Sequence, residues 1–289
     1  MASTPRACWR CRSSSGSGGR RCSGPPRPPL VTAAVDLHHW ETGQGGTVLC
    51  VHETATSSEV WRPLAEALGE RARTIAYDRR GWGRSEAPEP YLRTTVQEQA
   101  EDAARLLEGS GAAAAVLCGA GLGAVAALDL LLRRPELARG AVLLEPPLLA
   151  FVEDATELLS KDGGALREAV RAGGPAAGVE LYLAGELAAL GPGAERLPQE
   201  LSAPARERPL SLFAELAAVP SWPLPLAAMA RNPLPARIVV SGSTTGLLRR
   251  AADELAARLT HAALRELPGD RPAHLDDPRG LATLILELV

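Results

Sequence analysis

The sequence is poor in aromatic residues, and its basic residues are almost all arginine. Its 289 residues include two Phe, five Trp and three Tyr, and Lys161 is the one lysine. A substrate pocket is therefore expected to be mostly aliphatic, with Trp61, Trp82, Phe213 and Trp222 as candidates for larger contacts. The formal net charge of -3 gives no support for a nucleic-acid or acidic-membrane partner. No apolar run is long enough to span a bilayer, because the longest stretches, such as 112–120, are short and rich in alanine.

Cysteine is scarce and unevenly spread. Cys8 and Cys11 have the CxxC spacing of a metal-binding pair, but no second pair completes a zinc site. No metal or other cofactor is therefore predicted. Cys50 and Cys118 end apolar runs, and both are predicted to be buried free thiols.

Residues 1–29 differ in composition from the rest of the chain. They are rich in Arg, Ser, Gly and Pro, contain no acidic residue and have no apolar centre of a secretory signal. We predict a disordered basic tail, or a segment upstream of an unused start codon, with a transit-like arm as the alternative. Since no secretory signal is found, a cytoplasmic location is predicted.

From residue 30 onward, strand-like and helix-like runs alternate. The apolar strand pattern Thr47–Val51 ends at His52, and Ser58 is a candidate N-cap for the helix that carries Trp61. Because parallel strands need crossover connections, this alternation predicts an α/β fold with a doubly wound, mostly parallel sheet. The other expected strands are 31–37, 73–77, 112–118, 140–144, 236–242 and 263–267, and the other expected helices in the sheet domain are 95–107, 124–132, 247–259 and 279–288.

Between residues 148 and 232 the pattern is helical alone. Helices are expected at 150–159, 166–172, 179–190 and 210–218, separated by Gly and Pro. No strand-like run interrupts them. We therefore predict a helical cap over 148–232, inserted into a sheet domain formed by 30–147 and 233–289.

A glycine-rich turn joins the expected strand 112–118 to the helix that follows. Residues 119–123, Gly-Ala-Gly-Leu-Gly, have the spacing of the nucleophile elbow G-x-S-x-G, which holds a serine above a sheet. The central position is Gly121. The turn that presents a nucleophile is therefore predicted, but the nucleophile is absent.

Four segments, in this order, resemble the α/β-hydrolase superfamily, and the resemblance covers 30–289. Residues 48–61 resemble the strand and oxyanion loop of capped members, and 78–85 match the D-x-x-G-x-G-x-S turn. Residues 119–123 match the elbow without its serine, and 268–278 resemble the loop that carries the catalytic histidine. The resemblance implies an α/β-hydrolase fold with an inserted helical cap.

The resemblance assigns the catalytic roles only in part. His274 matches the catalytic histidine, whereas the nucleophile position is Gly121 and the usual acid position falls near Thr245. Glu53 stands where the family has a glycine, and a carboxylate there would repel a developing oxyanion. The other residues predicted for the elbow and oxyanion region are His52, Thr54 and Leu122.

Two carboxylates are candidates to act with His274. Glu145 ends a strand at a position where some capped members hold their acid, and it would orient His274 as a general base toward water. The alternative is that Glu145 caps the strand end or faces solvent. Glu53 and His274 would form an acid/base couple for proton transfer, elimination or decarboxylation. The alternative for Glu53 is an ion pair with an arginine such as Arg79 or Arg80.

The sequence therefore favours a divergent, cofactor-free enzyme with a degenerate catalytic triad. It would act on a small, largely apolar ester or carbonyl compound, with His274 as general base. A hydrolase-fold binding protein without chemistry is an alternative. Residues 119–124, Gly-x-Gly-x-x-Ala, also satisfy a dinucleotide-binding fingerprint, so an oxidoreductase is a third hypothesis. The predicted partner is a small molecule, and the oligomeric state is not assigned.

Overall fold

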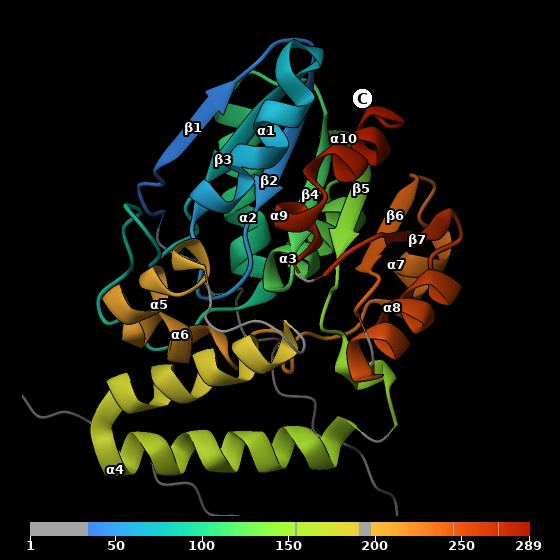
Figure 1. The fold of residues 1–289 in the computed structure, drawn as a ribbon. Helices are drawn as coiled ribbons and strands as arrows, with labels where there is room; N and C mark the ends of the chain where they lie inside the picture. The colour runs from blue at the N-terminus through green and yellow to red at the C-terminus, as the bar shows by residue number, and fades with distance from the viewer. Residues whose placement is uncertain (1–33, 154, 191–197, 245, 271) are drawn as a thin grey trace, which may run out of the picture. The chain divides into compact units, whose positions relative to one another are not determined.

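The computed structural model describes residues 34–153, 155–190, 198–244, 246–270 and 272–289. Within them a seven-stranded sheet has the order β1-β3-β2-β4-β5-β6-β7 (Figure 1). β1 pairs antiparallel with β3, and every other neighbouring pair in this sheet is parallel. The strands are β1 (His39–Thr42), β2 (Gly46–Val51), β3 (Ala72–Tyr77), β4 (Ala115–Ala120), β5 (Ala138–Leu144), β6 (Ala236–Ser241) and β7 (Ala262–Leu267).

Helices cover both faces of the sheet, because successive strand residues point to opposite sides. Leu49 and Leu117 pack in one core with α2, α3 and α8, whereas Cys50 and Cys118 pack in the other with α1 and α10. This arrangement confirms the doubly wound α/β class, and both cysteines are buried free thiols as predicted. The helices are α1 (Arg62–Leu68), α2 (Val96–Gly109), α3 (Leu122–Arg133), α8 (Gly246–Arg258) and α10 (Pro278–Leu286).

The described chain between β5 and β6 is helical. Its longest element, α4 (Ala155–Ala189), combines the three helices expected from 150 to 190 and bends at Gly174, whose φ of 76° suits glycine, just before Pro175. α6 (Pro209–Glu215) packs on the loop after β3, where Ser211 Oγ donates to Gly81 O at 2.6 Å. Figure 1 shows α4, α5 (Ala203–Glu207) and α6 gathered together, and α7 (Leu226–Arg231) follows them before β6.

These helices agree with an inserted cap, while the exact domain bounds predicted from the sequence stay a prediction. The predicted tail, residues 1–29, lies outside the described residues. None of the helices in the described part of the chain combines the length and the apolar character that a bilayer span needs.

Two local predictions differ from the structure. In the described part of 31–37 no strand forms, because Asp36 O and His38 O accept hydrogen bonds from the turn after β3, and strand pairing begins at His39. Ser58 is not an N-cap but the first residue of a 3-10 turn, and its N–H donates to Asp78 Oδ1 at 2.8 Å.

Candidate functional site

The turn between β4 and α3 is a sharp strand-to-helix reversal. β4 ends at Ala120, Gly121 has φ 53° and ψ -124°, and α3 begins at Leu122. This backbone conformation is strained for a residue with a Cβ, so glycine relieves strain here. The Gly121 N–H donates to Leu144 O of β5 at 3.0 Å, which fixes the turn against the neighbouring strand.

Four residues predicted for the site line one small cavity at this turn. Its volume is about 20 Å³, room for about one water molecule. Glu53 and Glu145 come from the loops after β2 and β5, and His274 comes from α9 (Ala273–Asp276). They meet because the loops at the carboxyl ends of parallel strands share one edge of the sheet. The lining residues are Glu53, Ala120, Gly121, Leu144, Glu145, Pro272, Ala273 and His274.

A second small cavity shares Glu53 and Pro272 with the first. Glu186 of α4 contributes to its wall, so this cavity lies between the sheet domain and the helical segment. The Glu53 side chain is 21% exposed and stands where the two cavities meet. The second cavity is lined by Glu53, Thr54, Ala55, Thr56, Glu186, Leu190, Leu201 and Pro272.

The imidazole of His274 is buried and neutral. Burial lowers its pKa from 6.5 to about 3, and the ring centroid of Trp61 lies 4.8 Å from its own. His274 Nε2 is 3.9 Å from Glu53 Oε1, beyond hydrogen-bond distance, and has no hydrogen-bond partner in the described part of the chain. A buried nitrogen of this kind, beside a cavity, is suited to exchange a proton with a small molecule bound there.

Protein stability is expected to fall in acid because of this histidine. Unfolded His274 titrates near 6.5, whereas folded His274 stays neutral down to about pH 3. Between these values the unfolded chain binds the extra proton, so the free energy of unfolding decreases as the pH falls. His274→Gln should remove roughly 2 kcal/mol of the loss in the free energy of unfolding between about pH 6.5 and about pH 4.5. Urea denaturation of both proteins across this range measures the difference, and parallel pH dependences would contradict a buried, neutral His274.

Glu53 occupies the space that a side chain at position 121 would need. A Cβ built on Gly121 would lie 2.9 Å from Glu53 Cβ and 3.7 Å from Glu53 Oε2. The first distance is shorter than the contact distance of two carbon atoms, so one of the two residues must give way if both carry side chains. The Glu53 side chain therefore fits at this position because residue 121 is a glycine. The carboxylate beside His274 comes from the loop after β2 rather than from the elbow.

Glu145 is held by hydroxyl groups at the end of β6 and in the turn that follows it. It has a φ of 43°, which is uncommon outside glycine, and its N–H donates to Val239 O at 3.0 Å. Its carboxylate accepts hydrogen bonds from Thr244 Oγ1 and, at 3.4 Å, from Ser241 Oγ. The side chain is buried, so the alternative that it faces solvent is wrong. Glu145 and His274 both line the first cavity. That Glu145 orients His274 as a general base stays a prediction.

His52 holds the loop that carries Glu53. Its Nε2 accepts the Arg79 backbone N–H at 2.9 Å, so the proton is on Nδ1, which donates to Glu53 O at 2.8 Å. Burial, and then the charge of Arg79, lower the pKa of His52 well below 6.5. His52 therefore has the structural role of fixing backbone, and it is absent from the walls of both cavities.

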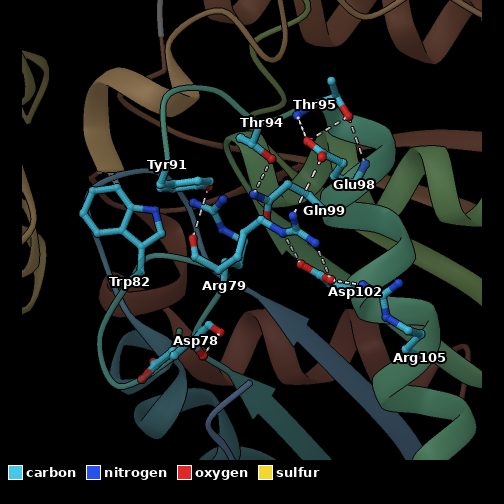
Figure 2. Close-up of polar contacts among 12 residues, drawn as sticks. Asp78, Arg79, Trp82, Tyr91, Thr94, Thr95, Glu98, Gln99, Asp102 and Arg105 are labelled. Carbon is cyan, nitrogen blue, oxygen red and sulfur yellow. Dashed lines mark hydrogen bonds and ion pairs between the residues drawn. The ribbon is translucent and has the colours of Figure 1, made fainter. Parts of the chain in front are cut away.

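Two buried arginines of the loop after β3 pair with neighbouring helices, and Arg79 Nε also donates to His52 O at 2.8 Å. The Arg79 guanidinium forms a two-pronged ion pair with Glu215 of α6, and Arg80 pairs with Asp102 of α2 at 2.6 Å. Figure 2 shows the same Asp102 carboxylate also facing Arg105. Arg79 and Arg80 thus have Glu215 and Asp102 as ion-pair partners, and an ion pair of Glu53 with an arginine stays a prediction.

The other predicted residues lie beside the first cavity or away from it. Thr54 lines the second cavity, and Leu122 opens α3. Phe213 packs among apolar residues of α4 and α6, and Trp222 Nε1 donates to Asp129 of α3 at 3.0 Å. Neither residue lines either cavity.

Within the described residues, no group of three or more His, Cys, Asp or Glu side chains is placed to hold a metal ion.

The fold and this site define a hydrolase-type α/β protein, and comparison of sequences gives its family. The model of the alpha/beta hydrolase family matches residues 48–284, which include the elbow and His274, so the chain belongs to that family. The match assigns the glycine turn to a hydrolase fold, and it gives no support to the dinucleotide-binding hypothesis.

Among curated proteins, a 2-(acetamidomethylene)succinate hydrolase of Mesorhizobium japonicum is 33% identical over 153 residues, which cover 52% of each chain. An epoxide hydrolase of Caballeronia sordidicola is 31% identical over 136 residues, covering 47% of this chain and 41% of that protein. The chain thus spans about half the length of the curated relatives it matches.

Among solved structures, an esterase from Thermogutta terrifontis has a TM-score of 0.73 at 19% identity, covering 88% of this chain and 92% of that one. An enol-lactonase from Burkholderia xenovorans has a TM-score of 0.67 at 19% identity, covering 88% and 96%. At these identities the likeness establishes the fold alone.

Proposed function

We propose that this protein is a cofactor-free hydrolase that acts on a small, apolar ester or related compound without a serine nucleophile. One observation carries the proposal: buried His274 Nε2, without a hydrogen-bond partner in the described chain, faces Glu53 across a cavity whose wall includes Gly121. The relatives named as hydrolases support hydrolysis as the reaction class. The proposal includes a small-molecule partner, no nucleic-acid or membrane partner, and the cytoplasmic location predicted from the sequence.

In this proposal His274 is the general base. Because its pKa is about 3, the imidazole is neutral and ready to accept a proton at neutral pH, although it is a weak base at rest. The carboxylates of Glu53 and Glu145 line the same cavity and favour the imidazolium that forms as water loses its proton. The low pKa also predicts that hydrolysis persists in mildly acidic solution.

In the proposal, the turn at Gly121 stabilises the negative charge that develops on the substrate. α3 begins at Leu122, so the positive end of the helix dipole and its first N–H groups lie next to Gly121. Backbone N–H groups at a helix N-terminus stabilise negative charge that develops on a substrate oxygen. The Glu53 carboxylate opposes that charge when it stays ionised, which limits how well an oxyanion is stabilised here.

The test is hydrolysis of a panel of short-chain nitrophenyl esters by wild type, His274→Ala and His261→Ala. His261 is exposed at the opposite end of β7 and serves as the matched control. We expect kcat/KM to fall about 100-fold or more in His274→Ala and to stay unchanged in His261→Ala. Equal kcat/KM values for ester hydrolysis in all three proteins would contradict the proposal.

A binding protein without chemistry is the second candidate function. The absence of a side chain at the elbow position, Gly121, favours it. It predicts no turnover of any ester by wild type, so the same panel separates the two candidates.

A further inference from the structure

We infer that Glu215 of α6 is a positioning residue for the loop after β2, residues 52–56, and that it acts on this loop through Arg79. The helical segment between β5 and β6 thereby sets the geometry of the edge of the sheet where the candidate site lies. For catalysis the inference rests on the proposed function, because it concerns the same site. The link from Glu215 to the loop is a structural claim, and it is tested without any turnover.

Arg79 holds the loop after β2 by two hydrogen bonds to His52. Its backbone N–H donates to His52 Nε2 at 2.9 Å, and its side-chain Nε donates to His52 O at 2.8 Å. His52 O and the N–H of Glu53 belong to one planar peptide group, so the side-chain bond fixes how the chain enters the loop. Inside the loop, His52 Nδ1 donates to Glu53 O at 2.8 Å, and Thr56 Oγ1 donates to the same oxygen at 3.0 Å. The course of the loop therefore depends on where the Arg79 guanidinium lies.

The Arg79 guanidinium is held in turn by Glu215. Its Nη1 and Nη2 donate to the two carboxylate oxygens, Nη2 at 3.0 Å, and both side chains are fully buried. A planar guanidinium that is bonded at both prongs has one orientation, which directs Nε at His52 O. Trp82 Nε1 donates to the same carboxylate at 2.8 Å and fixes its position. Buried charge-assisted bonds therefore join α6 to His52, although Glu215 lines neither cavity.

The loop needs this support because part of it has an unfavourable backbone conformation. Ala55 has a φ of 68°, in the left-handed region that a residue with a Cβ rarely adopts. Such a residue keeps this conformation only where its surroundings hold it. Ala55 is buried and packs with Val179 and Leu183 of α4 and with Leu212 of α6. The helical segment thus holds the loop by an apolar contact at Ala55 and by a polar contact through Arg79.

Residues of this loop form much of the wall of the candidate site. Glu53, Thr54, Ala55 and Thr56 line the second cavity, and Glu53 also lines the first, beside His274. A displacement of about 1 Å in the groups around a reacting molecule lowers a rate by as much as about 100-fold. Since Glu215 does not line the cavities, its loss should lower kcat through the loop and leave KM little changed.

The first experiment follows the ring proton on His52 Nδ1 by NMR of protein labelled with ¹⁵N-histidine. The chain has five histidines, so their ring signals are few enough to assign. In wild type this proton is bonded to Glu53 O inside a buried loop, and its exchange with water should be slow.

Two variants break the link from Glu215 to the loop at different points. Glu215→Gln removes the charge that orients Arg79, whereas Arg79→Lys keeps a cation for Glu215 and removes the bond to His52 O. We expect the His52 ring proton to exchange at least about 10-fold faster in both variants. Arg79→Lys decides the question if Glu215→Gln does not fold.

Asp102→Asn is the matched control. Asp102 forms a buried ion pair with Arg80, the neighbour of Arg79, but this pair joins the loop after β3 to α2 and not to His52. Its loss should lower the free energy of unfolding without changing the loop after β2. We expect the His52 ring proton of Asp102→Asn to exchange as slowly as in wild type.

The second experiment measures hydrolysis of short-chain nitrophenyl esters by the same four proteins, at a temperature where all are folded. Glu215→Gln and Arg79→Lys should lower kcat at least about 10-fold with KM nearly unchanged, and Asp102→Asn should keep the kcat of wild type. A role in stability alone would leave the kcat of folded protein unaltered in all three variants.

The outcomes distinguish this inference from the proposed function. Ring-proton exchange in Glu215→Gln and Arg79→Lys as slow as in wild type overturns the inference, and so does equally fast exchange in Asp102→Asn. Wild type without ester hydrolysis removes the proposed function, while the ring proton still tests the link from Glu215 to the loop. Hydrolysis that depends on His274 but keeps its full kcat in both variants overturns the positioning role alone.

Discussion

Glu53→Gly combined with Gly121→Ser is expected to react with a fluorophosphonate at least about 100-fold faster than Gly121→Ser alone. In the single variant the new Cβ would lie 2.9 Å from Glu53 Cβ, so the loop after β2 must shift or the serine is displaced. In the double variant the clash is gone, and a hydroxyl at the elbow can reach His274. Fluorophosphonate labelling followed by intact mass measures the rate.

The control for this experiment removes the base. The same double variant with His274→Ala should lose the fast labelling, because a serine needs an adjacent base to become nucleophilic. Labelling of Gly121→Ser as rapid as that of the double variant would show that Glu53 does not occupy the space of an elbow side chain.

Glu215→Ala is expected to lower the free energy of unfolding by about 3–5 kcal/mol. The substitution leaves the guanidinium of Arg79 buried without its ion-pair partner, and it also removes the acceptor of Trp82 Nε1 at 2.8 Å. All three side chains are buried, so water cannot replace the lost contacts. Urea denaturation at neutral pH measures the effect.

Glu180→Ala is the matched control. Glu180 of α4 forms the same two-pronged geometry with Arg206, at 2.7 and 2.9 Å, but both side chains are more than half exposed. Solvent screens such a pair, so no measurable change in stability is expected. Similar losses in Glu180→Ala and Glu215→Ala would contradict burial as the cause.

The parts of the site that the sequence predicted are those that depend on local pattern. The turn at Gly121 follows from an apolar run, closely spaced glycines and a helical period, all within 112–132. His274 could be placed by the loop that carries it, and His52 by the end of β2. Because parallel strands expose their carboxyl ends at one edge, these local features also placed the residues near one another.

The parts that the sequence could not predict depend on pairing between distant residues. Arg79 and Glu215 are 136 positions apart, and no motif marks Glu215 as its partner. The strand expected at 31–37 does not form in the described residues, because pairing with β3 rather than local propensity sets the position of β1 at His39–Thr42. Trp222 was a pocket candidate only because aromatic residues are scarce, whereas its indole is bonded to Asp129.

The most direct test of hydrolysis without a serine nucleophile is the rate of nitrophenyl ester hydrolysis by wild type before and after treatment with excess fluorophosphonate. We predict measurable hydrolysis that the reagent leaves unchanged, and an intact mass without a phosphonyl group. Hydrolysis abolished together with phosphonylation of a serine would contradict this, because it would place the nucleophile on a residue other than those around Gly121.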